Sequence, residues 1–172
     1  MTQELIDLRS SILEGRYDDA LLLVDELEGM GRQAILRNIE SFLVRMLAHL
    51  IKNQLEERLT NSWVASIADS ILQIKKLNLK DNKASCYIKI DEWEPFLEEA
   101  IEAAIAPASV EVLNGRFNPI QVGEQGDQAL LILTSQRLLN LTYQHSTKEL
   151  PAAITHCLPE LSGGQEWYEG RG

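Results

Sequence analysis

Residues 32–59 read RQAILRNIESFLVRMLAHLIKNQLEERL, and this stretch decides the fold. Its apolar side chains recur every three or four residues, as they do along one face of an amphipathic α-helix. They are Ile35, Ile39, Phe42, Leu43, Met46, Leu47, Leu50 and Ile51. Charged residues such as Arg45 and Glu56 fall on other faces. A helix of this length rises about 42 Å, so we predict that it forms the central element of the domain.

Helical periodicity extends to the N-terminal side of this stretch. We predict one helix over residues 4–14 and another over residues 18–28, because apolar residues in both recur at helical spacing. Gly15 is expected to separate these helices, and Gly29 and Gly31 are expected to end the second.

Three further helices are predicted downstream, over residues 60–74, 91–107 and 127–143. The first follows side chains that can serve as its N-cap, namely Thr60, Asn61 and Ser62. Asp91 can cap the second, and Pro107 is expected to end it because proline breaks the hydrogen-bond pattern of a helix interior.

The last third of the chain carries weaker patterns. Val110 to Val122 predicts a short β-hairpin, since Asn114-Gly115 suits the tight turn between paired strands. Residues 151–172 are rich in glycine and proline and are expected to form an irregular tail. The predicted fold class is mainly all-α, a multi-helix bundle around one long central helix, with a helical domain over residues 1–150.

Composition indicates a globular protein with an acidic second half. The 172 residues are 45% hydrophobic and 24% charged, which is ordinary for one folded domain. The net charge is −10; residues 1–90 hold 13 acidic and 12 basic side chains, and residues 91–172 hold 13 and 4. An acidic domain repels phosphate backbones, so nucleic acid is disfavoured as a partner.

The sequence indicates a cytoplasmic protein without a membrane segment. Cys86 and Cys157 share no paired spacing and are expected to stay reduced, as in cytosolic proteins. The N-terminus, MTQELIDLRSS, lacks the basic start and apolar run of a signal peptide. The longest aliphatic runs, at residues 20–24 and 129–133, are far too short to span a bilayer.

Two patterns with chemical potential have simpler interpretations. Residues 29–34 match the glycine fingerprint GxGxxA, but acidic residues at 25–28 precede them where a dinucleotide site needs a strand, so we interpret them as a helix connector. Glu94, Glu98 and Glu102 lie one turn apart, but no histidine has the Glu-x-x-His spacing of carboxylate-bridged metal bundles. We interpret them as a solvated acidic face.

The histidines and cysteines predict neither a metal site nor a cofactor site. His49 lies at the edge of the apolar stripe and is interpreted as a boundary residue that donates one hydrogen bond. Imidazole titrates near neutrality, so a role as general base stays open. His156 and Cys157 are adjacent rather than spaced for joint metal ligation.

Four short motifs resemble those of one family. They are EGR at residues 14–16, ELEGMGR at 26–32, LAHLIK at 47–52 and Ser62-Trp63. On these residues the chain resembles the largely cyanobacterial family called domain of unknown function 29, although Asn53 stands where that pattern has tryptophan. The resemblance covers about residues 13–74, and more loosely the helix after Asp91. It implies a helical fold in a bacterial, cytosolic setting, and it implies no activity, because the family has none assigned.

We predict a non-enzymatic helical module for protein–protein interaction, because the sequence combines long amphipathic helices with no convergent reactive groups. The expected partner is a protein, and association with further copies of the chain stays open. One alternative is an enzyme of unfamiliar type with an inter-helix site near His49, using Glu26 and Arg32. Another is a nucleic-acid accessory protein that uses a lysine-rich stretch, namely Lys75, Lys76, Lys80, Lys83 and Lys89, opposed only by Asp81.

Overall fold

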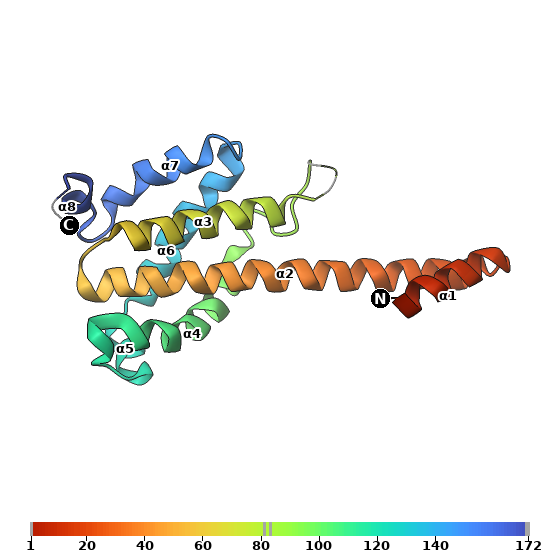
Figure 1. The fold of residues 1–172 in the computed structure, drawn as a ribbon, viewed down its shortest axis with the longest axis horizontal. Coiled ribbons are helices and arrows are strands. Elements are labelled where there is room, and N and C mark those ends of the chain that lie inside the picture. Colours follow the sequence, from red (N-terminus) through yellow and green to blue (C-terminus); the bar gives the residue numbers. More distant parts are fainter. Residues whose placement is uncertain (1, 81, 83, 171–172) are drawn as a thin grey trace. The chain divides into compact units, whose positions relative to one another are not determined.

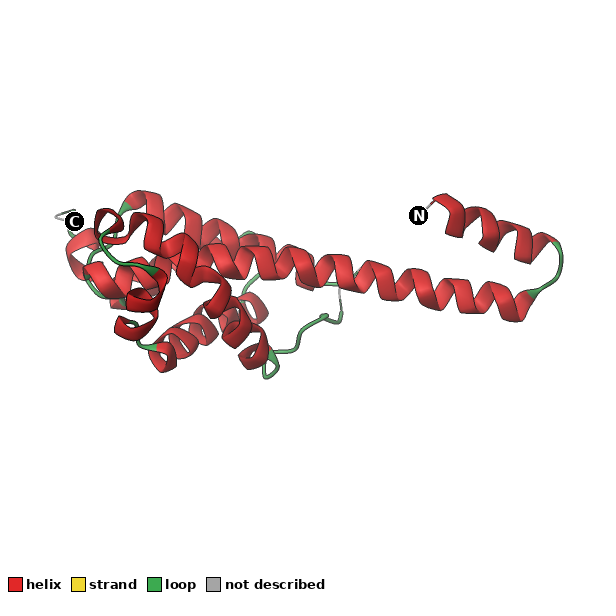
Figure 2. Ribbon diagram, turned by 90° about the horizontal axis from the view of Figure 1, so that it is seen from below, coloured by secondary structure: helices red, strands yellow, loops and turns green. Residues whose placement is uncertain are grey.

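A computed structural model describes residues 2–80, 82 and 84–170, and its regular elements are helices (Figures 1 and 2). In chain order they are α1 (Thr2–Leu13), α2 (Tyr17–Glu56), α3 (Asn61–Asn78), α4 (Trp93–Glu111), the 3₁₀ helix η1 (Val112–Gly115), α5 (Pro119–Gln125), α6 (Gln128–Gln144), α7 (Leu150–Cys157), the 3₁₀ helix η2 (Leu158–Glu160) and α8 (Gly164–Tyr168). No strand occurs in the described ranges, where extended pairing is limited to a bridge between Leu79 and Cys86. The predicted all-α class is confirmed.

The chain divides into two compact units. Unit 1 comprises residues 1–38 and unit 2 comprises residues 39–172, and α2 contributes its first part to unit 1 and its last part to unit 2. Among the residues described, no helix is both long enough and apolar enough to cross a membrane.

Unit 1 is a hairpin of α1 and the first part of α2. Gly15 makes the turn with φ of 73°, a left-handed conformation that glycine adopts without steric cost. The turn is closed by a hydrogen bond of 2.8 Å from the Arg16 amide to the Ser11 carbonyl. Ser11 and Ala20 are the buried side chains in the described part of unit 1. The hairpin therefore buries small side chains and has no large apolar core.

Helix α2 runs unbroken through Gly29 and Gly31, so the prediction that these glycines end a helix was wrong. A glycine in an exposed helix costs about 1 kcal/mol relative to alanine, which a helix of 40 residues can absorb. The predicted long central helix is confirmed. It ends at Glu56, slightly before the expected Leu59, because Glu57 adopts a left-handed φ of 52°.

The core of unit 2 is built on the last part of α2. Most of the predicted apolar stripe is buried there, namely Ile39, Leu43, Met46, Leu47, Leu50 and Ile51. Phe42 is only half-buried, so it lies at the edge of the core rather than at its centre. Helix α3 lies beside this part of α2 (Figure 1), and Arg45 on α2 pairs with Asp69 on α3 at 2.9 Å. Helices α6 and α7 pack on α3, and α4 packs against α5 and α6.

Helix α4 continues past Pro107 to Glu111, although proline was expected to end it. The proline ring removes the N–H that would bond the carbonyl of Ala103. Ala103 is exposed, so water can satisfy this carbonyl. Pro107 was therefore a wrong stop signal: it lies, like Ala103, at an exposed position of α4.

The predicted hairpin over residues 110–122 is absent from the described structure, and this prediction was wrong. Leu113 and Asn114 take left-handed φ values of 48° and 59° within η1. Asn118 then caps α5 and Pro119 occupies its first turn. The same Asn-Gly and proline signals that suit a hairpin also suit a left-handed turn and a helix start. In the structure they form the left-handed turn and the start of α5.

Residues 151–170 are mostly helical, which corrects the expectation of an irregular tail for the described part of this segment. Leu150 and Ile154 of α7, and Leu158 of η2, are buried. Gly163 has φ of 68°, and a Cβ at this position would lie 2.5 Å from the carbonyl oxygen of Glu57. The glycines that suggested irregularity instead let this segment pack closely against the turn after α2.

Candidate functional site

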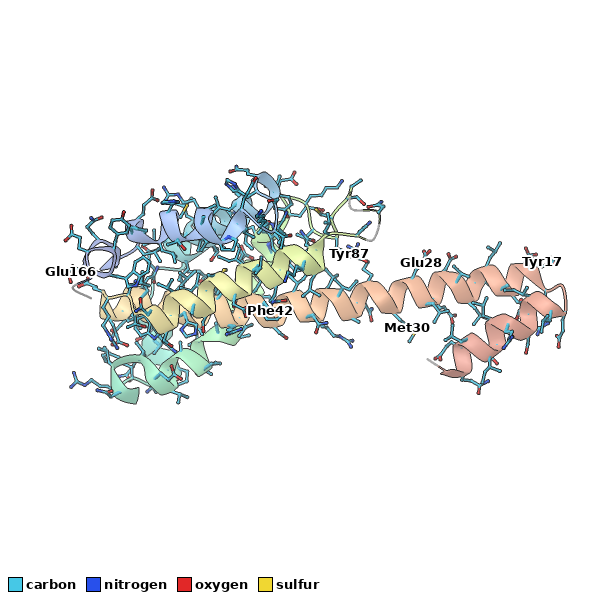
Figure 3. The ribbon with its side chains drawn as sticks, turned by 45° about the horizontal axis from the view of Figure 1, so that its top comes forward. Tyr17, Glu28, Met30, Phe42, Tyr87 and Glu166 are labelled. Carbon is cyan, nitrogen blue, oxygen red and sulfur yellow. The ribbon has the colours of Figure 1, made fainter. Side chains whose placement is uncertain are left out.

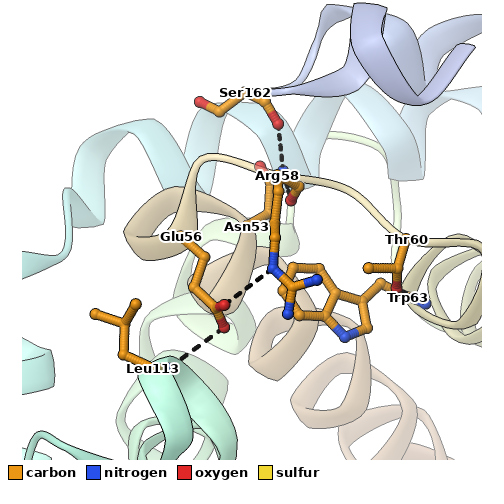
Figure 4. Close-up of polar contacts among 7 residues, drawn as sticks. All are labelled: Asn53, Glu56, Arg58, Thr60, Trp63, Leu113 and Ser162. Atoms are coloured by element: carbon orange, nitrogen blue, oxygen red, sulfur yellow. Dashed lines mark hydrogen bonds and ion pairs between the residues drawn. The ribbon is translucent and has the colours of Figure 1, made fainter. Parts of the chain in front are cut away.

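Two side chains of α2, Asn53 and Glu56, hold the turn after α2 and connect it to later segments of unit 2 (Figure 4). The Asn53 amide donates hydrogen bonds to the carbonyl of Arg58, at 3.0 Å, and to the carbonyl of Ser162, at 2.7 Å. Glu56 accepts a hydrogen bond from the Arg58 guanidinium at 3.0 Å and a longer one from the Leu113 amide at 3.4 Å. The turn is thus fixed to the segments that follow α4 and η2.

Trp63 lies directly after this turn, and cationic side chains lie near its ring. Thr60 caps α3 by accepting a hydrogen bond from the Trp63 amide at 3.1 Å, which sets the direction of the helix. The Arg58 guanidinium carbon lies 4.8 Å from the centroid of the buried Trp63 ring, and the Lys52 Nζ lies 6.0 Å from it. The His49 ring lies 6.5 Å away at an interplanar angle of 40°. We name His49, Lys52, Arg58 and Trp63 the Trp63 cluster.

Lys52 carries a buried charge in this cluster. Its side chain is 5% exposed and pairs with the carboxylate of Glu111 on α4, which is 66% exposed. The hydrogen bond and the positive charge of Lys52 lower the pKa of Glu111. Transferring an ammonium group out of water is costly unless it is paired, so Glu111 compensates Lys52 while itself staying hydrated.

His49 is a neutral member of the cluster at physiological pH. Burial is the main cause that lowers its pKa to about 4, followed by the positive charge of Lys52; Glu111 opposes this, and Arg45 adds a lesser lowering effect. Its Nδ1 is buried and has no hydrogen-bond partner among the described residues. A general base works best with a pKa near the operating pH, so this environment disfavours base catalysis by His49.

Unit 1 exposes large apolar side chains on both of its helices. Their exposed fractions range from 36% to 79%, and they are Leu5, Ile6, Ile12, Leu13, Tyr17, Leu21, Leu22, Val24 and Met30. We name these nine side chains the unit 1 apolar surface. Apolar patches of several hundred Å² are rare on monomeric proteins and mark interaction sites.

A comparison with protein families identifies residues 14–114 as matching the model described as "Domain of unknown function DUF29". The chain belongs to the DUF29 family. The predicted resemblance is therefore confirmed, and it extends further than residues 13–74. None of the curated proteins and none of the solved structures that were compared matches the chain.

The DUF29 match contains the Trp63 cluster and its acidic partner. The family motifs around His49, Lys52 and Trp63 are distant in sequence from Glu111, and the fold joins them through the pair between Lys52 and Glu111. The match ends at Asn114, one of the two left-handed residues of η1. Helices α5 to α8 therefore lie outside the segment that defines DUF29 membership here.

An apolar groove lies in unit 2 between α4, α5 and the start of α6. It has a volume of about 450 Å³, and its apolar lining includes Ile51, Ile101, Ile105, Ile120, Val122 and Leu131. Glu102 and Glu124 also line it. Both carboxylates belong to exposed residues, so the groove offers apolar contact rather than buried reactive groups.

The lysine-rich stretch is partly used within the fold. Lys75 donates a hydrogen bond of 2.5 Å to the carbonyl of Thr142, and the Lys80 ammonium lies 5.4 Å from the Tyr87 ring centroid. Lys76 and Lys89 are exposed. Two residues named in the nucleic-acid alternative, Lys83 and Asp81, lie outside the described residues.

The remaining predicted candidates are three possible catalytic residues and two cysteines. Glu26 and Arg32 belong to unit 1 and His49 belongs to unit 2, and the enzymatic grouping of these three stays a prediction. Cys86 and Cys157 are free, and burial raises the pKa of the Cys157 thiol.

Glu94, Glu98 and Glu102 are all exposed on α4, which fits the interpretation as a solvated face. Among the described residues, no three or more histidine, cysteine or acidic side chains converge to hold a metal ion.

Sequence reasoning missed two features of these sites. It used the apolar residues of 18–28 only as evidence for a helix and did not predict that two of them, Leu21 and Val24, would be exposed. The available signal was a spacing of four and three residues that continues from Tyr17 to Ile35, which becomes visible once the helix is taken as unbroken. It also placed the charged residues of 32–59 off the apolar stripe, and no local pattern indicates that Lys52 would be buried and paired with Glu111.

Proposed function

We propose that this DUF29 protein is a non-enzymatic helical module for protein–protein interaction, and that unit 1 carries the interface. The observation that carries the proposal is the unit 1 apolar surface. In unit 2 the large apolar residues of α2 are buried or half-buried, whereas in unit 1 Leu13, Tyr17 and Leu21 are more than half exposed. Exposed leucine and tyrosine side chains gain free energy when a partner removes them from water.

The chemistry of unit 2 supports a binding role over catalysis. Each cation near Trp63 has an acidic partner: Lys52 pairs with Glu111, and Arg58 with Glu56. Cations paired in this way are engaged within the fold. The low pKa of His49 points in the same direction.

The proposal includes a protein partner and a cytoplasmic setting. The net charge of −10 still disfavours nucleic acid, and Lys75 and Lys80 have partners within the fold. The nucleic-acid alternative would require salt-sensitive binding through the remaining lysines.

A photo-cross-linking experiment tests the proposed interface in native host cells. A photoreactive amino acid replaces Leu21 in the full chain, and in a matched control it replaces Val110, which is 74% exposed on unit 2. The proposal predicts protein adducts at position 21 well above those at position 110. Equal or weaker capture at position 21 would show that unit 1 is not the interface.

A further inference from the structure

We infer that the partner of unit 1 is a second copy of the chain, bound through an antiparallel pairing of the first part of α2. This inference rests on the proposed function and names the partner of the same surface. Three features of the described residues carry it: a continuous seam along α2, the placement of charges beside that seam, and the exposed apolar area of the hairpin.

The seam follows a spacing of four and three residues, which is the heptad pattern of helices that pair along their length. It consists of Tyr17, Leu21, Val24, Glu28, Gly31 and Ile35. All six are exposed except Ile35, which is half-buried. Figure 3 shows Tyr17 and Glu28 projecting from one side of α2 and Met30 from the other. The seam is therefore a face of α2 distinct from the one that carries Met30.

Glu28 and Gly31 interrupt the apolar character of the seam. An added Cβ at Gly31 would meet no atom within 4 Å, so the fold of the single chain does not require glycine here. A small residue in a helix seam lets another helix approach closely, and a polar residue in the seam favours one register and orientation over others. Both interruptions are consistent with pairing that is specific and moderate in strength.

The charges beside the seam favour an antiparallel pair of identical chains. Asp18, Asp25 and Arg32 are seven residues apart, so they share one heptad position on one flank of the seam, and all three are exposed. In an antiparallel pair, this flank of one helix lies next to the same flank of the other helix. Arg32 of one copy then faces an aspartate of the other. In a parallel pair, this flank would meet the opposite flank, which consists of Ala20, Leu27 and Ala34 and carries no charge.

The hairpin of unit 1 leaves exposed the apolar seam side chains that a second copy would cover. Tyr17 is 65% exposed, Leu21 63% and Val24 36%. Units of fewer than about 40 residues rarely hold a core without a staple or oligomerisation. A two-fold symmetric pair of hairpins would bury these side chains in a small four-helix arrangement.

Sedimentation velocity of the full chain over a range of concentrations tests the inference. The wild-type chain is expected to convert from monomer to dimer, and Leu21→Glu to weaken this equilibrium more than about tenfold, because it would bury an unpaired charge in the seam. Leu21 is 63% exposed, so the variant is expected to fold, which circular dichroism checks. Val110→Glu, at a comparably exposed apolar site in unit 2, should leave the equilibrium unchanged.

A charge exchange tests the antiparallel orientation. Arg32→Asp makes the whole flank acidic and should weaken the dimer, and the triple variant Asp18→Arg, Asp25→Arg, Arg32→Asp should restore it, because opposite charges meet again. A purely structural role of Arg32 would not produce this rescue. A dimer that tolerates Arg32→Asp, or a triple variant as weak as the single one, would overturn the orientation.

The outcomes separate this inference from the proposed function. A monomer at all concentrations, together with capture of a different protein at position 21, would overturn self-association and leave the interaction module standing. A monomer without capture at position 21 would overturn both. A dimer that Val110→Glu disrupts as strongly as Leu21→Glu would place the interface outside unit 1.

Discussion

Leucine side chains of helix α2 have opposite environments in the two units of the chain. Leu21 of α2 is 63% exposed in unit 1, and Leu43 of the same helix is fully buried in unit 2. Both belong to apolar patterns with helical periodicity, so periodicity alone identifies the apolar face but not what covers it. The difference lies in the neighbours: α3 lies beside α2 in unit 2, whereas the hairpin of unit 1 buries only Ser11 and Ala20 among its described residues.

We propose that the two units have different roles. Residues of unit 2 stabilise the fold of a single chain, and exposed residues of unit 1 stabilise a complex. Substitutions in unit 2 should therefore change the free energy of unfolding, whereas those on the seam should change association. The predictions below test this separation.

The largest expected effect is that of Met46→Ala in unit 2. Met46 is fully buried, so truncation loses transfer free energy and leaves a cavity, at a cost of about 2 to 5 kcal/mol in the free energy of unfolding. Phe42→Ala should cost less, because Phe42 is half-buried. Leu21→Ala, measured at concentrations where the chain is monomeric, should change stability by less than about 0.5 kcal/mol. Urea melts compare the three, and a Leu21→Ala cost equal to that of Met46→Ala would erase the contrast between the units.

The second prediction concerns the buried charge of unit 2. Glu111→Gln leaves the Lys52 ammonium without its counter-charge and should cost about 1 to 3 kcal/mol. The matched control is Glu102→Gln on the exposed face of the same helix, which should cost less than about 0.5 kcal/mol. Adding Lys52→Met to Glu111→Gln should recover part of the loss in thermal or urea melts. Without such recovery, Glu111 would act by some route other than Lys52.

Sequence alone predicted the elements whose signals are local and redundant. The stripe around Met46 and Leu47 is buried as expected, and Thr60, one of the predicted N-cap residues, caps the helix that follows it. Gly15 forms the expected turn. In each of these cases capping chemistry, turn chemistry and periodicity agree, which makes the prediction robust.

The failures occurred where one local signal had two structural uses. Gly31 was treated as a stop, but the cost of a helical glycine is small against a long helix. Asn114 suits a hairpin turn and a left-handed turn equally well, and Pro119 suits a helix start as well as an edge strand. The Trp63 cluster was not predicted for another reason. The pair between Lys52 and Glu111 joins residues 59 positions apart, and tertiary contacts of this kind leave no periodic pattern in the sequence.

The third prediction contrasts glycines of the two units. Gly29 lies in the exposed helix of unit 1 with open space around it, so Gly29→Ala should stabilise the chain by about 0.5 to 1 kcal/mol. Gly163→Ala in unit 2 should destabilise by about 1 to 3 kcal/mol, because of its positive φ and its close approach to the Glu57 carbonyl. Gly170→Ala has the same sign of φ with open space and isolates the backbone term. Chemical denaturation measures all three, and a destabilising Gly29→Ala would contradict the view that α2 is unpacked at this residue.

The fourth prediction is a pH dependence confined to unit 2. The pKa of His49 is about 4 in the folded state and 6.5 in the unfolded state. As the pH falls below 6.5 the unfolded state binds the proton first, so the stabilisation that is complete above pH 6.5 declines toward pH 4. His49→Gln should flatten the decline between pH 6.5 and 5, and the exposed His156→Gln should not. An unchanged slope in His49→Gln would show that His49 is not protected from protonation.

Hydrogen exchange measured as a function of protein concentration tests the central claim most directly. The account predicts that backbone amides over residues 17–35 exchange more slowly as concentration rises, because dimerisation covers the seam, while amides over residues 39–56 keep the same slow exchange at every concentration. In Leu21→Glu the concentration dependence should disappear from residues 17–35, with the slow exchange of residues 39–56 unaltered. Exchange over residues 17–35 that is independent of concentration in the wild-type chain, and as slow as that over residues 39–56, would contradict the assignment of unit 1 as an interface.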